Sequence, residues 1–317
     1  MEVTEARWRL AVAFAIVYLV WGSTYLFMRL AVETIPPLLV SGVRFVTAGV
    51  LLYLLALSVG KPEPRKVPWK GHALAGTLLT AGNASIAIAV RLIPSGVASL
   101  LVALTPCLMV VLEWYRTRLG VPKLTLLLGL ALGICGTIVL VGPQGIGGAP
   151  VDPRGAAVVI VGTLAWASGS VYSRSLPYHS TTLRTSAIQM ATDGSIVTLI
   201  ALAHGDGSTL VRDGLSTASL LSLVYLVVMG SVLGYTAYTY LLRHTSAARV
   251  STYAFVNPVV AVVLGATFAG EPLSPRVMLA AILIVAAVVL VVTGESGRKT
   301  TADSLENAKP LAVEEAP

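Results

Sequence analysis

Long apolar runs separated by short polar connections make up the chain as far as about residue 294. Within a run the apolar residues are continuous instead of alternating with polar ones, which favours helices over barrel strands. A bilayer offers no partner for a backbone amide, so a spanning helix needs about 20 such residues. Ten runs qualify, near residues 9–30, 37–59, 71–91, 95–114, 123–141, 155–175, 183–204, 217–242, 247–269 and 276–294. The pattern predicts an all-α integral membrane protein with ten transmembrane helices.

Composition and charge agree with this fold class. Hydrophobic residues make up 56% of the 317 residues and charged residues 12%, which is about half of the ~25% that a soluble domain carries. Mean hydropathy is +0.83, so much of the apolar surface must face lipid. A net charge of +7 would suggest nucleic acid in a soluble protein, but here the basic residues stand in small groups at the ends of apolar runs. We therefore expect the lipid bilayer as a partner and no nucleic acid.

The distribution of Lys and Arg predicts the orientation of the chain. With the N-terminus in the cytoplasm, most basic residues fall on the cytoplasmic side, whereas Arg91, Arg154, Arg212 and Arg276 fall outside. Ten spans then place both termini in the cytoplasm of a multi-pass protein of the cell (inner or plasma) membrane. Residues 295–317 are polar and lack apolar periodicity, which predicts a disordered cytoplasmic tail.

The second half of the chain repeats the first. At an offset of 145 residues the matching pairs include Trp21 and Trp166, Ser23 and Ser168, and Arg29 and Arg174. At an offset of 152 they include Gly82 and Gly234, Arg91 and Arg243, and Pro106 and Pro258. Because each half holds an odd number of spans, the halves must insert in opposite orientations. This predicts two inverted five-helix repeats, residues 1–145 and 150–294, a design typical of secondary transporters.

Several short motifs in these runs are found together in one known family. They are Trp21-Gly22-Ser23, Arg44-Phe45, the mid-span Pro106 and Pro258, and the turn Gly270-Glu271-Pro272. Over nearly the whole chain apart from the tail, the sequence resembles the EamA-type ten-helix permeases of the drug/metabolite transporter superfamily. The resemblance implies export of amino acids or other small metabolites. The corresponding turn in the first half, residues 118–122, has no acidic residue, so we assign Glu271 no shared mechanistic role.

Two charged residues within the runs are candidates for function, because ionisable groups are expensive at membrane depth. Asp193 lies about ten residues into its run, which is ~15 Å at about 1.5 Å per residue, and its side chain is too short to reach the surface. It could exchange a proton during transport or pair with a cation. Arg44 either extends outward to the interface or turns inward to meet a carboxylate, that of Asp193 or that of a substrate.

The two prolines have two open interpretations. Proline removes one amide and leaves the carbonyl four residues earlier, here of Val102 and Ala254, without its usual donor. Each proline is then either a packing kink or a way to present a carbonyl to a wet cavity.

Aromatic and amide side chains complete the candidate substrate site. We expect substrate binding by Trp21, Tyr25, Arg44, Asn83, Trp166, Gln189, Asp193, Tyr235, Tyr238 and Asn257, with helix kinks at Pro106 and Pro258. Ordinary helix packing is the alternative for the aromatic residues, and a helix–helix hydrogen bond is the alternative for Asn257. Glycines such as Gly42 and Gly49 are expected to allow close helix approach.

These features predict a secondary transporter, an exporter of a small polar metabolite such as an amino acid, that works by alternating access between the two repeats. An integral-membrane enzyme and a channel are the alternatives. The four His lie in loops or near span ends, and Cys107 and Cys135 lack metal-ligand spacing. No Walker motif is present, so we expect no ATP site, no cofactor and no metal. Protons are the candidate coupling ion, with facilitated diffusion as the alternative. Substrate identity, and whether the protein is a monomer or a homodimer, stay open.

Overall fold

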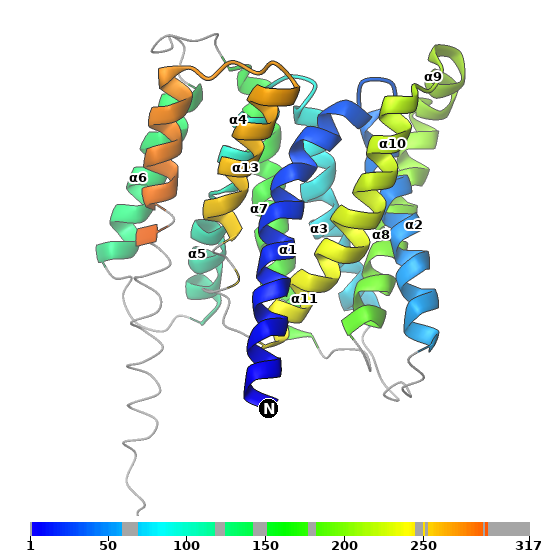
Figure 1. The fold of residues 1–317 in the computed structure, drawn as a ribbon, viewed down its shortest axis with the longest axis horizontal. Helices are drawn as coiled ribbons and strands as arrows, with labels where there is room; N and C mark the ends of the chain where they lie inside the picture. Colours follow the sequence, from blue (N-terminus) through cyan, green and yellow to red (C-terminus); the bar gives the residue numbers. More distant parts are fainter. Residues whose placement is uncertain are drawn as a thin grey trace, which may run out of the picture.

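The computed structural model describes residues 2–58, 69–117, 124–141, 151–176, 182–244, 250, 253–287 and 289–290. The regular structure of these residues is helical, and the helices lie side by side along one common direction (Figure 1). Their bounds are α1 Glu2–Ala31, α2 Pro37–Ser58, α3 Trp69–Ala89, α4 Ser95–Val102, α5 Thr105–Thr117, α6 Leu124–Val141, α7 Pro153–Ser175, α8 Thr182–Ala203, α9 Asp206–Asp213, α10 Thr217–Tyr225, the π-helix η1 Leu226–Leu233, α11 Gly234–His244 and α13 Tyr253–Phe268. A last helix covers Pro275–Ala287. The predicted tail, residues 295–317, lies outside the described residues.

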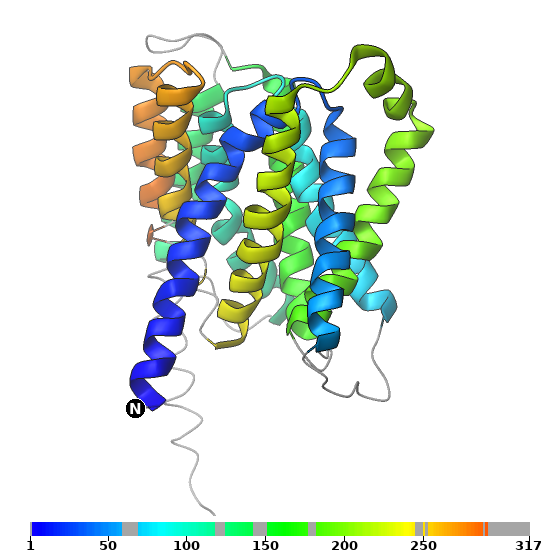
Figure 2. The same ribbon diagram turned by 45° about the vertical axis from the view of Figure 1, so that its right-hand side comes forward.

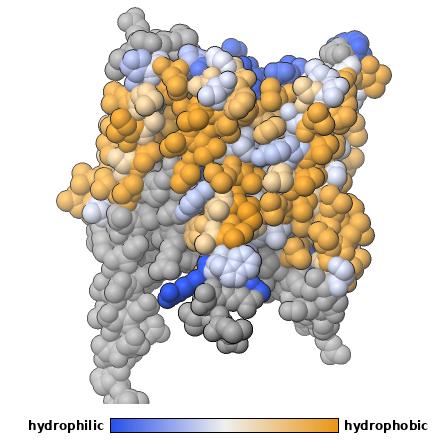
Figure 3. Space-filling model, in the orientation of Figure 1, coloured by the Kyte–Doolittle hydropathy of each residue, from blue (hydrophilic) through white to orange (hydrophobic). Residues whose placement is uncertain are grey.

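Six segments of the described chain are long and apolar enough to cross a membrane. They are Arg7–Ala31, Pro37–Ser58, Ser95–Arg116, Pro153–Ser173, Leu183–Ala203 and Thr217–Leu241. Leu127–Gly136, Val256–Phe268 and Pro275–Ala287 are shorter apolar helices. Apolar side chains cover the middle of the face seen in Figure 3, and hydrophilic ones gather toward its top edge. The all-helical membrane class is therefore confirmed, whereas helix length and composition do not by themselves give ten crossings.

The run predicted over 95–114 is interrupted. It forms α4 and α5 with a turn between them, and Pro106 is the second residue of α5. A proline in the first turn of a helix removes an amide that has no intrahelical acceptor in any case. The hydroxyl of Thr105 donates to the Val102 carbonyl at 2.5 Å, so this carbonyl has a donor from the chain itself. Pro258, by contrast, lies inside the continuous helix α13.

The run predicted over 217–242 contains a segment of π-helix, η1, between α10 and α11. A π-helix bonds residue i to i+5, and such segments are frequent at functional sites. The preceding stretch, predicted as a loop, holds the short helix α9. Apolar periodicity could not reveal the π segment because composition is uniform through it.

Glycines allow helices from the two halves of the chain to pack closely. A Cβ added to Gly49 of α2 would lie 2.5 Å from the backbone nitrogen of Ala191 in α8. A Cβ added to Gly82 of α3 would lie 2.9 Å from the Trp166 Cβ in α7. The close approach expected at Gly49 is confirmed, and small residues at such contacts let backbones meet.

Helices α1 and α7, which carry the matching Trp21 and Trp166, run in opposite directions. In Figure 1 α1 rises from the labelled N-terminus, and Figure 2 shows the same helix from another side. The far end of α1 is near the start of α7: Arg29 Nη1 donates to the Val90 carbonyl at 3.1 Å, and nearby Ile93 contacts Gly155. The two tryptophans therefore meet from antiparallel helices.

Candidate functional site

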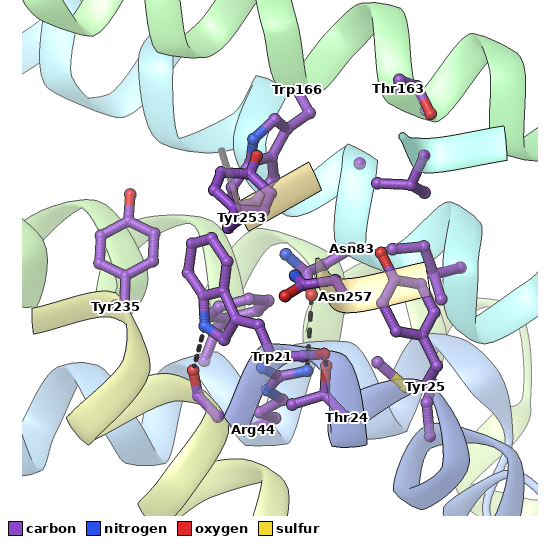
Figure 4. A pocket seen from close by; sticks show the side chains of 17 residues that line it. Trp21, Thr24, Tyr25, Arg44, Asn83, Thr163, Trp166, Tyr235, Tyr253 and Asn257 are labelled. Atoms are coloured by element: carbon purple, nitrogen blue, oxygen red, sulfur yellow. Dashed lines mark hydrogen bonds between the residues drawn. The ribbon is translucent and has the colours of Figure 1, made fainter. Parts of the chain in front are cut away.

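A cavity lies inside the bundle, between helices from both halves of the chain. The space between the atoms that border it is about 670 Å³, a figure that includes the part open to the surroundings. Figure 4 shows its side chains pointing in from several helices. The lining residues are Trp21, Thr24, Tyr25, Met28, Arg44, Phe45, Gly82, Asn83, Ile86, Val102, Gly162, Thr163, Trp166, Gly230, Tyr235, Tyr253 and Asn257.

Aromatic rings form one wall of the cavity. The Trp21 ring meets the Trp166 ring edge to face, with centroids 5.9 Å apart and planes at 83°. It meets Tyr253 in the same way at 5.3 Å and 87°. Tyr238 is not among the lining residues; it packs against Trp21 at 4.8 Å between ring centroids and is 3% exposed. Aromatic rings prefer edge-to-face arrangements, which join Trp21 to Trp166 and to Tyr253. Tyr238 packs on Trp21 in a tilted arrangement and belongs to the same aromatic cluster.

The π-helix supplies hydrogen-bond partners to two other helices. The indole Nε1 of Trp21 donates to the Gly230 carbonyl at 3.0 Å. Arg44 Nε donates to the Ser231 hydroxyl at 2.7 Å. A Cβ added to Gly234 would lie 2.5 Å from Trp21 Nε1. The close fit of α1 against η1 and the start of α11 thus depends on glycine at position 234.

Arg44 points inward and is 4% exposed. Its Nη1 lies 3.4 Å from Asn83 Oδ1, and its Cζ lies 5.1 Å from the Phe45 ring centroid. Among the described residues, no carboxylate forms an ion pair with it. A guanidinium carries five N–H donors, and a buried charge is costly unless it is paired. The cavity therefore contains a positive group that can bind an anion.

Two of the residues expected at the site border a smaller space next to the cavity. Gln189 and Asp193 line it, and the space between its bordering atoms is about 190 Å³, including the part open to the surroundings. Phe45, Trp166 and Tyr235 border both spaces. The two spaces therefore share a wall, and Asp193 does not reach Arg44.

Gln189 has its polar atoms engaged. Its Oε1 accepts from the Tyr235 hydroxyl at 3.3 Å, and its Nε2 lies 3.2 Å from both Ser173 Oγ and His72 Nδ1. This network joins α3, α7, α8 and α11 beside the smaller space, and it holds Tyr235 in the shared wall.

Asn257 of α13 lines the cavity and also links helices. With its amide oriented to satisfy both neighbours, its nitrogen donates to the Tyr18 carbonyl at 3.0 Å and to the Tyr253 carbonyl at 3.2 Å. The helix–helix bond to α1 is the interaction expected of a lone Asn in a span. Both interpretations of Asn257 are therefore compatible with its position.

Some lining residues were not predicted from the sequence. Thr24 follows Trp21 by three positions and Tyr253 precedes Asn257 by four, so helical spacing could have placed each beside a residue that was chosen. Gly230 gave no such signal, because its contact with Trp21 comes from the π segment.

A second charged cluster lies at the end of the bundle where α4 begins. The Glu271 carboxylate accepts from the Ser95 backbone N–H at 2.8 Å, the Ser95 hydroxyl at 2.7 Å and the Gly96 N–H at 3.1 Å. Arg29 Nε lies 3.7 Å from it. A carboxylate is favoured at a helix N-terminus, whose N–H groups lack acceptors. Glu271 thus joins α1 and α4 to the segment that follows α13.

Comparison with known proteins decides the family. The model of the EamA-like transporter family matches residues 8–142 and 153–293. The chain belongs to this family. It is 37% identical to the inner membrane transporter YedA of Escherichia coli strain K12, over 88% of this chain and 89% of that one. It is 27% identical to a protein of the same strain named "Probable amino-acid metabolite efflux pump", over 90% and 95%.

The fold of this EamA-like transporter also occurs in solved structures. One crystal structure superposes with a TM-score of 0.62 and 20% sequence identity, over 94% of this chain and 98% of that one. The two relatives reported above are named as a transporter and an efflux pump. Within the described residues, no group of three or more His, Cys, Asp or Glu side chains is arranged to hold a metal ion.

Proposed function

We propose that this EamA-like transporter is a secondary transporter that exports a small polar metabolite bearing a carboxylate, such as an amino acid. One observation carries the proposal: Arg44 borders the cavity, and no described carboxylate pairs with it. A guanidinium recognises a carboxylate through paired N–H donors. The relative named as an amino-acid metabolite efflux pump supports the same substrate class.

The shape of the cavity supports an amphiphilic substrate. Trp21, Trp166 and Tyr253 give it an aromatic wall, and Arg44 and Asn83 give it a polar one. In the proposed complex the carboxylate binds Arg44 and the side chain packs on the rings.

Alternating access between two inverted five-helix repeats, residues 1–145 and 150–294, is the proposed mechanism. It is supported by the antiparallel course of α1 and α7 (Figure 1) and by the cavity, whose lining residues come from helices of both halves. The proposal requires ten crossings. Six are the long apolar segments described under the fold, and the other four are α3, α6, α13 and Pro275–Ala287. Both termini are then cytoplasmic, which reporter fusions at either end would test.

Flux through proteoliposomes tests the proposal. With a uniformly labelled mixture of the twenty protein amino acids, a carrier gives saturable uptake that is accelerated by unlabelled amino acids inside, the signature of counterflow. A channel gives conductance without counterflow, and an enzyme gives chemically altered label. The matching amines, which lack the carboxylate, should not stimulate counterflow. Stimulation by amines equal to that by amino acids would contradict the role of Arg44.

A further inference from the structure

Asp193 is buried with one carboxylate oxygen unsatisfied. The residue is 1% exposed. Its Oδ1 accepts from the Thr77 hydroxyl at 3.2 Å, whereas its Oδ2 has no hydrogen-bond partner. It lines the smaller space beside the main cavity. A carboxylate with one hydroxyl donor at membrane depth is expensive to keep charged and unpaired.

Its position depends on a glycine of the neighbouring helix. A Cβ added to Gly76 of α3 would collide with Asp193 Oδ2. Position 76 therefore leaves room for the carboxylate between α3 and α8. The Asp193 carboxylate thus occupies space that is free because residue 76 has no side chain.

The groups around Asp193 include no cation bonded to it. From α3, His72 contacts Gln189 Nε2, and from α11, Tyr235 lines the space and donates to Gln189. From α2, Arg44 bonds to Ser231 and Asn83, and it lines the main cavity but not the smaller space. Among the described residues, Asp193 thus has no ion-pair partner.

A proton fits this environment better than a metal ion does. It needs a single acceptor oxygen, and once bound it makes Oδ2 a hydroxyl and removes the charge. Metal cations such as Ca²⁺ need several oxygen ligands, and no described cluster of acidic or His side chains provides them.

We propose that Asp193 is the binding site of a coupling proton, in a compartment separate from the substrate cavity. The proton forms an O–H bond at Oδ2 on one side of the membrane and leaves to water on the other. No electrons move, and the carboxylate is regenerated. This inference rests on the proposed transport function.

The shared wall links the two sites. Phe45, Trp166 and Tyr235 touch both spaces, so a substrate that displaces any of them alters the surroundings of Asp193. Coupling between two ligands is reciprocal: if the substrate changes proton affinity, the proton changes substrate affinity by the same factor. Substrate affinity should therefore depend on pH only while position 193 carries an acid.

Proteoliposomes with a pH-sensitive dye inside test the proposal. Wild-type protein should accumulate the labelled amino-acid mixture against its gradient when a pH gradient is imposed, and adding the mixture should move protons. Asp193→Asn should retain counterflow within about twofold of the wild type and lose both gradient-driven accumulation and proton movement. Asp206→Asn, an acid-to-amide change on α9, is the matched control and should behave as wild type.

The outcomes separate this proposal from the transport function. Absent counterflow in the wild type overturns transport itself. Counterflow without proton movement in the wild type, or a Na⁺ requirement, overturns only the proton site. Retained pH-driven accumulation in Asp193→Asn also overturns it, as does equal loss of counterflow and accumulation in well-folded variant protein. Thr77→Val provides a second measurement, because it keeps the acid and should shift the pH midpoint of transport without abolishing coupling.

Discussion

Arg44 and Asp193 lie in adjoining spaces and form no ion pair with each other. Arg44 bonds to Ser231 and Asn83, and Asp193 bonds to Thr77. Phe45, next to Arg44 in sequence, borders both spaces. Direct pairing would satisfy both charges within the protein. In the functions proposed above, this separation leaves Arg44 to bind the substrate carboxylate and Asp193 to bind a proton.

Replacing Arg44 tests its assignment as the carboxylate anchor. Arg44→Gln should weaken amino-acid binding about 10- to 100-fold, since hydrogen bonds to charged groups contribute about 1.5–3 kcal/mol. The amino-acid affinity of Arg44→Lys should fall between those of the wild type and Arg44→Gln, because an ammonium keeps the charge but lacks the planar donor pair. Protection of the purified protein against heat by amino acids measures the change. Arg184→Lys, at a guanidinium that stacks over Tyr53, is the control, and undiminished protection in Arg44→Gln would refute the assignment.

Replacing Trp21 by Phe keeps an aromatic ring and removes the donor to the Gly230 carbonyl. Loss of that bond should destabilise the protein by about 1–2 kcal/mol, because the Gly230 carbonyl is left without a hydrogen-bond donor. Counterflow should decline as well, since the ring is no longer tied to η1. Thermal unfolding in detergent measures stability, with Trp8→Phe, at a residue 55% exposed, as control. If both variants unfold at the same temperature, the bond contributes nothing measurable.

The contact between α2 and α8 predicts a large effect for a small substitution. Gly49→Ala should destabilise the fold by roughly 1–3 kcal/mol, the usual effect of overpacking, because its Cβ meets backbone of α8. Gly207→Ala is the matched control: only the flexible end of Leu202 lies nearby, at 3.0 Å, and alanine is the better helix former. Thermal unfolding should rank Gly49→Ala well below Gly207→Ala, and the reverse order would contradict the close packing.

Glu271→Gln tests the cluster at the start of α4. The amide keeps the shape but removes the charge that faces two backbone N–H groups and Arg29, so stability should fall by about 1–2 kcal/mol. The measurement is again thermal unfolding in detergent. Asp152→Asn, at the N-cap of α7, is the control because Asn also caps well, and it should change stability less. An equal effect of both would show that the charge of Glu271 is not important.

The sequence predicted the parts of the site that leave a local signature. Trp21 and Trp166 stood out through the repeat, and Arg44 and Asp193 through charge within an apolar run. The division into two spaces was not predictable, because helical periodicity does not tell which neighbour a side chain meets. Glu271 was assigned no role for the same reason: its partner Ser95 is 176 positions away.

Pro106 and the π-helix show a second limit of the sequence. The run 95–114 was predicted as one kinked helix, yet the chain ends one helix before the proline and starts another. At this break the Val102 carbonyl accepts from the hydroxyl of Thr105, a contact that the apolar pattern does not predict. In η1 the hydrogen-bond pattern changes while the residue types do not.

Because of the π-helix, the shape of the cavity depends on the number of residues in this segment as well as on their identity. One residue turns an α-helix by about 100°, so deleting a single position between Leu226 and Leu233 would rotate Tyr235 and Tyr238 away from the tryptophans. No side chain of the wall need change for that loss. Among relatives, therefore, a one-residue gap in this stretch should separate transporters of different specificity even when every cavity residue is the same.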